Sequence, residues 1–143
     1  MDSKLLVRFT AIMAIIAIST TTAVATNVTI EKVNVKYTPS NVSVEFYYRL
    51  DTLQQIKGFL YGAKYIEEDL LSLFNGTSNI TVDKVDFKHA EINMDIIRFN
   101  NTAYFPGEEL NEPVENITLF FPGNSTVKLN KTSRIPEAFY SLN

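Results

Sequence analysis

The chain of 143 residues has no cysteine and no tryptophan, and it contains one histidine, five glycines and five prolines. Without cysteine it forms no disulfide and offers no thiolate to a metal. With His89 as its one histidine, it cannot build a two-histidine zinc motif, and a Ser-His-Asp triad would have to use that residue. We expect His89 to be solvated or to make a single hydrogen bond. These absences remove many common catalytic sites.

Sequence motifs of enzymes are also missing. The chain has no G-x-S-x-G, H-E-x-x-H, P-loop or G-x-G-x-x-G pattern. Asp83, Asp86, Glu91 and Asp95 could gather around a calcium ion, but no repeat spacing supports such a site. The acidic run at 67–69 is more typical of a solvated helix face than of a metal site. The sequence therefore predicts no enzyme, no cofactor and no metal site.

Long apolar runs are rare, and the one that occurs lies near the start of the chain. Lys4 and Arg8 precede an apolar region of ten residues, Phe9–Ile18, in which Thr10 is polar, and the small residues Ala23 and Ala25 occupy the positions that a signal peptidase recognises. We predict a signal peptide at 1–25 and a single extracellular domain at 26–143. The alternative is a retained anchor, because residues 5–25 could span about 30 Å as a helix. On either interpretation, residues 26–143 lie outside the cell, without a further membrane span.

The most abundant motif is Asn-x-Ser/Thr, the acceptor for N-glycosylation, which an extracytoplasmic chain meets. Chance placement of these residue types would give about two such triplets, whereas the chain has eight. They begin at Asn27, Asn41, Asn75, Asn79, Asn100, Asn116, Asn124 and Asn130. These eight asparagines are the predicted glycosylation sites, placed in turns and at the ends of helices and strands, and we expect N-linked glycans at several of them. The net charge of −3 argues against nucleic acid or an anionic membrane surface as a partner.

Dense sequons in a chain without cysteine resemble archaeal cell-surface glycoproteins more than animal secreted proteins. The resemblance covers size, location and glycan density rather than a motif. It implies a subunit of a filament or an envelope lattice.

The first half of the chain predicts two strands and a helix. Residues 28–37 alternate with a phase slip at Glu31-Lys32, which indicates a strand with a bulge, and residues 42–50 alternate strictly. Together they predict an antiparallel hairpin. From Asp51 to Asn75, apolar residues recur every three or four positions, which predicts one helix whose apolar stripe covers the sheet. Gly58 and Gly62 on this helix indicate close approach to the sheet.

The second half predicts further strands. Residues 80–99 form two strands or one kinked strand, residues 103–113 form a loop, and residues 114–121 and 126–130 form a strand pair. Residues 135–140 are expected to pack as a short turn. The predicted fold class is α+β, with a single long helix packed on an antiparallel, twisted sheet in the order ββα followed by three or four strands.

The predicted function is that of a secreted or cell-surface structural glycoprotein that works by self-assembly or adhesion. Its partners would be other copies or cell-envelope proteins, and the segment from Thr26 to Ile30 could be donated as a strand to a neighbour. The alternative is a monomeric secreted binding module for a small solute or a partner protein. Its site would use exposed aromatic residues such as Tyr47 and Tyr61. A third, least favoured possibility is a secreted enzyme that uses His89.

Overall fold

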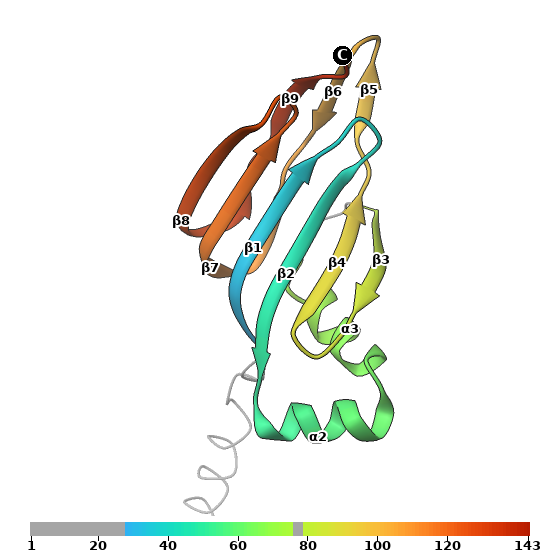
Figure 1. Cartoon of the computed structure of the whole chain (residues 1–143), viewed down its shortest axis with the longest axis vertical. Coiled ribbons are helices and arrows are strands. Elements are labelled where there is room, and N and C mark those ends of the chain that lie inside the picture. The colour runs from blue at the N-terminus through green and yellow to red at the C-terminus, as the bar shows by residue number, and fades with distance from the viewer. Residues whose placement is uncertain (1–27, 76–78) are drawn as a thin grey trace, which may run out of the picture.

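The structure is a computed structural model that describes residues 28–75 and 79–143, and it consists mostly of strand (Figure 1). The predicted signal peptide and Asn27 lie outside the described residues. Within these ranges the elements are β1 (Val28–Tyr37), β2 (Val42–Leu50), α2 (Thr52–Tyr61), α3 (Lys64–Leu71), β3 (Ile80–Val85), β4 (His89–Met94), β5 (Ile97–Phe99), β6 (Thr102–Phe105), β7 (Glu108–Phe121), β8 (Ser125–Ile135) and β9 (Ala138–Ser141).

The strands form two sheets. A six-stranded sheet has the order β3-β4-β2-β1-β7-β8, and a three-stranded sheet has the order β5-β6-β9. The prediction of an α+β chain is confirmed, but the prediction of a wholly antiparallel sheet is wrong, because β1 and β7 run parallel. The hairpin of β5 and β6 adds one reversal of chain direction between β4 and β7. As a result, β7 runs in the same direction as β1 (Figure 1).

The first hairpin matches its prediction. β1 and β2 pair antiparallel from Val28 opposite Leu50 to Tyr37 opposite Val42, and the register shifts at Glu31. The alternating apolar residues of β2 are buried, which makes this hairpin the centre of the hydrophobic core. The alternation of apolar and polar side chains, with its single phase slip, therefore predicted the positions of both strands and of the bulge.

Within the described residues the later strands depart from prediction in number and extent, because seven strands, β3 to β9, follow the helices where three or four were predicted. Residues 80–99 were predicted to form two strands or one kinked strand, and they form three. β3 and β4 pair as a hairpin with a register shift between Val82 and Lys84, and β5 follows. The predicted loop at 103–113 is wrong, because β6 and the first half of β7 occupy it. The segment at 135–140 contributes to β9, which pairs with β6. Pairing with distant strands extends these segments beyond what their own side-chain pattern indicates.

The prediction of a single long helix is also wrong, because two helices, α2 and α3, replace it. Asp51 caps α2 as predicted, and its carboxylate accepts the Gln54 N–H at 2.8 Å. The helix ends at Gly62, whose φ of +85° suits glycine and redirects the chain before α3. α3 buries Ile66 and Leu70 in the core, as the apolar stripe predicted. The stripe of α2 stays in solvent.

Aromatic side chains join the two sheets away from the helices. The ring of Tyr37 on β1 stacks on Phe121 of β7 at 4.6 Å between centroids. Phe105 of β6 and Tyr140 of β9 approach Tyr37 edge-on at 6.1 and 5.5 Å. The Tyr140 hydroxyl donates to the Thr38 carbonyl at 2.7 Å. Both hydroxyls are protonated donors at neutral pH, as any tyrosine is, and burial raises the pKa of Tyr37 and Tyr140 further.

We expect Gly107→Ala to destabilise the protein more than Gly123→Ala. Both glycines have φ above +80°, so alanine at either site costs about 1–2 kcal/mol. A Cβ at Gly107 would also lie 2.8 Å from the Ile135 carbonyl oxygen, whereas one at Gly123 would meet nothing within 4 Å. This overlap with backbone adds about 1–3 kcal/mol. Urea unfolding of both variants measures the difference, and equal losses would contradict this packing of the turn between β6 and β7 against the chain before β9.

Candidate functional site

The described residues carry a concentrated apolar surface at one end of the molecule, where α2 lies across the ends of the strands (Figure 1). Its side chains come from α2, the start of α3 and the turn between β3 and β4, and they are between 40% and 85% exposed. We call it the α2 surface; its residues are Leu53, Ile56, Phe59, Leu60, Tyr61, Tyr65 and Phe87. Surfaces of this kind mark contact sites when several large apolar residues are contiguous.

Specific contacts hold α2 in place although its apolar stripe is exposed. The Gln54 side chain is buried and donates to Asp69 of α3 at 3.1 Å, and Gln55 donates to the Leu50 carbonyl at 3.0 Å. Gly58 faces Phe87, where an added Cβ would lie 2.6 Å from the ring. Gly58 therefore makes a close approach, but to the β3–β4 turn rather than to the sheet, and Gly62, for which the same approach was predicted, has no neighbour within 4 Å of an added Cβ. α2 turns its polar and small residues inward and its large apolar residues outward.

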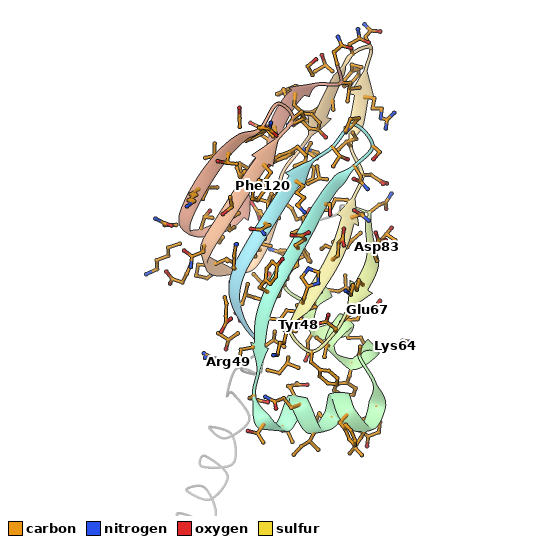
Figure 2. All side chains as sticks on the ribbon, in the orientation of Figure 1. Tyr48, Arg49, Lys64, Glu67, Asp83 and Phe120 are labelled. Atoms are coloured by element: carbon orange, nitrogen blue, oxygen red, sulfur yellow. The ribbon has the colours of Figure 1, made fainter. Side chains whose placement is uncertain are left out.

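A groove of about 690 Å³ lies beside the α2 surface, between α2, β2 and the β3–β4 turn. Tyr47, Phe59 and Phe87 supply its aromatic walls. Its charged residues are Lys88, Arg49 and Glu31, and the Glu31 carboxylate lies 3.8 Å from Arg49. Figure 2 shows Tyr48 and Arg49 at this end of β2, above α2. The predicted exposure of Tyr47 and Tyr61 agrees with the structure, which leaves them 37% and 69% exposed.

The turn that carries Phe87 is fixed by hydrogen bonds. The Asp86 carboxylate accepts the N–H groups of Lys88 and His89 at 2.8 and 2.7 Å. These backbone donors hold the pKa of Asp86 below its usual value. The Tyr48 hydroxyl donates to the Asp86 carbonyl, and burial raises the pKa of Tyr48. Phe87 is thus presented on a rigid turn.

Charges of both signs adjoin α2. Residues 52–66 contain Lys57 and Lys64, whereas Asp51 caps α2 and Asp69 of α3 accepts a hydrogen bond from Gln54. The Lys57 ammonium lies 5.3 Å from the centre of the Tyr65 ring, a cation–π distance. The α2 surface therefore combines apolar, aromatic and basic side chains.

The candidate metal ligands of the sequence lie apart and have separate partners. Asp83 and Asp95 accept hydrogen bonds from Asn93 and Asn79, and Glu91 accepts one from Ser43 at 3.1 Å. Within residues 28–75 and 79–143, no cluster of three or more His, Asp or Glu side chains could hold a metal ion. His89 is half-buried at the start of β4, with its ring 4.9 Å from that of Tyr47.

Seven of the eight sequon asparagines are among the described residues. Six are exposed: Asn75, Asn79, Asn100, Asn116, Asn124 and Asn130; Asn41 is half-buried in the turn between β1 and β2. Asn116 and Asn130 lie inside β7 and β8 rather than at strand ends, so that part of the predicted placement is wrong. A glycan needs space at the protein surface, and an exposed position in a strand provides that space as well as a position in a turn does. No sequon begins between Asn41 and Asn75, the stretch that contains α2.

Most of the α2 surface was missed by reasoning from sequence. Leu53, Ile56 and Leu60 were assigned to the core because their spacing is that of a helix buried on one side. Phe87 was not singled out at all. The signal that could have separated α2 from α3 is Gly62, which permits the change of direction between them.

In the part of the chain that the structure describes, neither helix has the length and apolarity needed to cross a membrane.

Comparison of the chain with family models, with curated proteins and with solved structures finds no match.

Proposed function

We propose that this chain is an N-glycosylated structural protein of the cell exterior, without enzymatic activity, that works by attachment to its own copies or to other components of the cell envelope. The observation that carries the proposal is the exposed α2 surface in a chain with eight sequons. No sequon begins within residues 42–74, the stretch that contains α2, although Asn27 precedes Val28, whose partner Leu50 lies at the α2 end. Glycans at the other sequons would keep their surroundings hydrated and leave the α2 surface for contact.

The edges of the six-stranded sheet are poor contact sites by comparison. The edge strand β8 carries Lys128, Lys131 and Arg134, together with the sequon at Asn130. The other edge, β3, contains a bulge and follows the sequon at Asn79. Charges, bulges and bulky groups on edges oppose pairing with another sheet. Attachment through the α2 surface is therefore favoured over growth of the sheet.

Donation of the N-terminal strand would require a rearrangement. Residues 28–30 pair with residues 48–50 of the same molecule, and Val28 is buried. A donated strand would have to leave these partners. Attachment through α2 needs no such change, so we favour it as the route of assembly.

The test is electron microscopy of envelopes from cells that produce the protein. We expect ordered arrays or filaments from the native chain and from Phe139→Asp, which alters an exposed residue of β9. Phe59→Asp places a charge on the α2 surface and should abolish the order. Monodisperse monomers from all three chains, without any ordered polymer, would contradict the proposal.

The groove beside α2 favours a second candidate, a monomeric binding module. Its aromatic walls and the charges of Arg49 and Lys88 suit a small solute or a segment of a partner protein that has both flat and polar parts. Such a module would remain monomeric in the microscopy experiment, and Tyr47→Ala would weaken ligand binding without changing its assembly state.

A further inference from the structure

We propose that an N-linked glycan at Asn100 folds back onto the outer face of the three-stranded sheet, where its sugar rings stack on exposed aromatic side chains. The inference rests on the proposed glycosylation of the chain, and it gives one sequon a structural role. It concerns β5, β6 and β9, at the end of the molecule opposite to α2 (Figure 1).

The outer face of the three-stranded sheet is apolar and exposed. Phe99 of β5 and Phe139 of β9 are 63% and 69% exposed, whereas Phe105 and Tyr140, on the other face, are buried against the six-stranded sheet. Positions two apart along a strand lie on the same face. The outer face therefore consists of two rows across β5, β6 and β9: Ile97, Tyr104 and Phe139 in one, and Phe99, Thr102 and Ser141 in the other.

The sequon at Asn100 lies at the end of this face. Asn100 and Asn101 form the turn between β5 and β6, and Thr102, whose hydroxyl completes the sequon, is in the same row as Phe99. The Asn100 side chain is exposed, and its φ of +50° is a conformation that asparagine tolerates. The row that contains Tyr104 lies two residues further along β6, a distance of about 7 Å. A glycan on Asn100 therefore begins beside Phe99 and reaches the second row with its first sugars.

The chemistry of the outer face suits a sugar. The rings of Tyr104 and Phe139 stack at 4.4 Å between centroids, with their planes 25° apart, and form a broad flat surface. The C–H groups of a pyranose ring carry partial positive charge and pack on the negative face of an aromatic ring. Glu137 accepts a hydrogen bond from the Tyr104 hydroxyl at 3.2 Å. Its carboxylate can accept further bonds from sugar hydroxyls.

Attachment at Asn100 favours the glycan over a separate occupant of this face. A group on a short tether has an effective concentration in roughly the millimolar range, so weak stacking contacts are sufficient to hold it in place. The same bulky, hydrated group would lie between the face and a second copy of the chain. The glycan would thus cover the apolar residues at this end and leave the α2 surface for attachment.

The sequon at Asn124 provides a matched comparison. Asn124 also lies in a turn between two antiparallel strands, β7 and β8, and also has a positive φ, of +65°. Phe139 points away from the six-stranded sheet, because the next residue, Tyr140, contacts Tyr37 of β1. Phe121, beside the Asn124 turn, stacks on the same Tyr37. We therefore expect a glycan at Asn124 to make no contact with Phe139.

The test is a double-mutant cycle on the full glycoprotein from its own cells. Thr102→Val removes the sequon without changing Asn100, and Phe139→Ala removes one ring of the face without changing the sequon. The contact between Phe139 and Tyr104 is lost in both Phe139→Ala chains, so its loss cancels in the cycle. We expect Thr102→Val to lower the equilibrium constant of folding about threefold more in the native chain than in the Phe139→Ala chain. Urea unfolding measures all four chains.

Two control variants show whether the effect belongs to the glycan at Asn100. Thr102→Ser keeps the sequon and should show no such dependence on Phe139. Thr126→Val removes the sequon at Asn124 and should also lack that dependence. The same dependence in either control would contradict the proposal, and so would an equal effect of Thr102→Val with and without the Phe139 ring.

Glycopeptide mapping of the native chain separates this inference from the proposed function. An unmodified Asn100 in a chain that carries glycans at other sequons would overturn this inference alone. The proposed function fails separately if the native chain forms no ordered assembly, a result that leaves the packing of the glycan on Phe139 untouched.

Discussion

Replacing Phe105 with alanine is expected to lower the free energy of unfolding by about 3–5 kcal/mol. Phe105 is fully buried, and its ring meets Tyr37 of the other sheet. Removal leaves a cavity beside Tyr37, whose ring also contacts Phe121 and Tyr140, and the hydrogen-bonded hydroxyls of the two tyrosines prevent their rings from closing it freely. The stability of the two sheets as one unit should therefore depend on this residue.

Phe139→Ala is the matched control for that change. Phe139 is also a phenylalanine of the three-stranded sheet, but it is 69% exposed and stacks on Tyr104 at 4.4 Å. Its loss should cost less than about 1 kcal/mol. Guanidinium unfolding curves measure both values. A loss for Phe105→Ala no larger than for Phe139→Ala would show that the two sheets do not share a core.

The second large effect is expected at Leu70, on the helix that packs on the sheet. Leu70 is 2% exposed, and Leu70→Ala should destabilise the protein by about 2–5 kcal/mol. Leu60 occupies an equivalent place in the same apolar stripe but is 65% exposed. Leu60→Ala should change stability by less than about 0.5 kcal/mol.

Comparison of Leu60→Ala with Leu70→Ala also distinguishes two helices from one continuous helix in this part of the chain. If one continuous helix covered the sheet, both leucines would be buried and both substitutions would be costly. Similar losses at Leu60 and Leu70, measured by chemical unfolding, would thus contradict the break at Gly62 and the exposure of α2.

The parts of the fold that could be predicted from sequence are those whose side-chain pattern has one interpretation. Strict alternation from Val42 to Leu50 indicated a half-buried strand, and the slip at Glu31 indicated a bulge. The cap at Asp51 follows from local chemistry alone. Such features are determined by residues that are close in sequence, and they form regardless of how the rest of the chain folds.

The helical stripe shows why the rest could not be predicted. Spacing of three and four tells which residues share a face, but it does not tell whether another element covers that face. The same pattern is buried in α3 and exposed in α2. The first half of β7 was missed for a related reason, since its residues 108–113 show no alternating apolar pattern, and partners distant in sequence hold it.

The α2 surface combines both difficulties. Its helix was predicted but assigned to the core, and Phe87 comes from a turn 28 positions after Phe59. Only the arrangement of the chain in space brings them together. Exposed aromatic residues were expected at Tyr47 and Tyr61, and these mark the groove and the surface that the structure describes.

The measurement that tests the account most directly is the intact mass of the protein from its own cells, with glycopeptide mapping of the sequon asparagines. The account predicts a mass that exceeds its polypeptide by several N-linked glycans, attached at exposed sites such as Asn100 and Asn124. A mass equal to that of the unmodified polypeptide, whether the full chain of 16.2 kDa or residues 26–143, with every sequon asparagine unmodified, would contradict it.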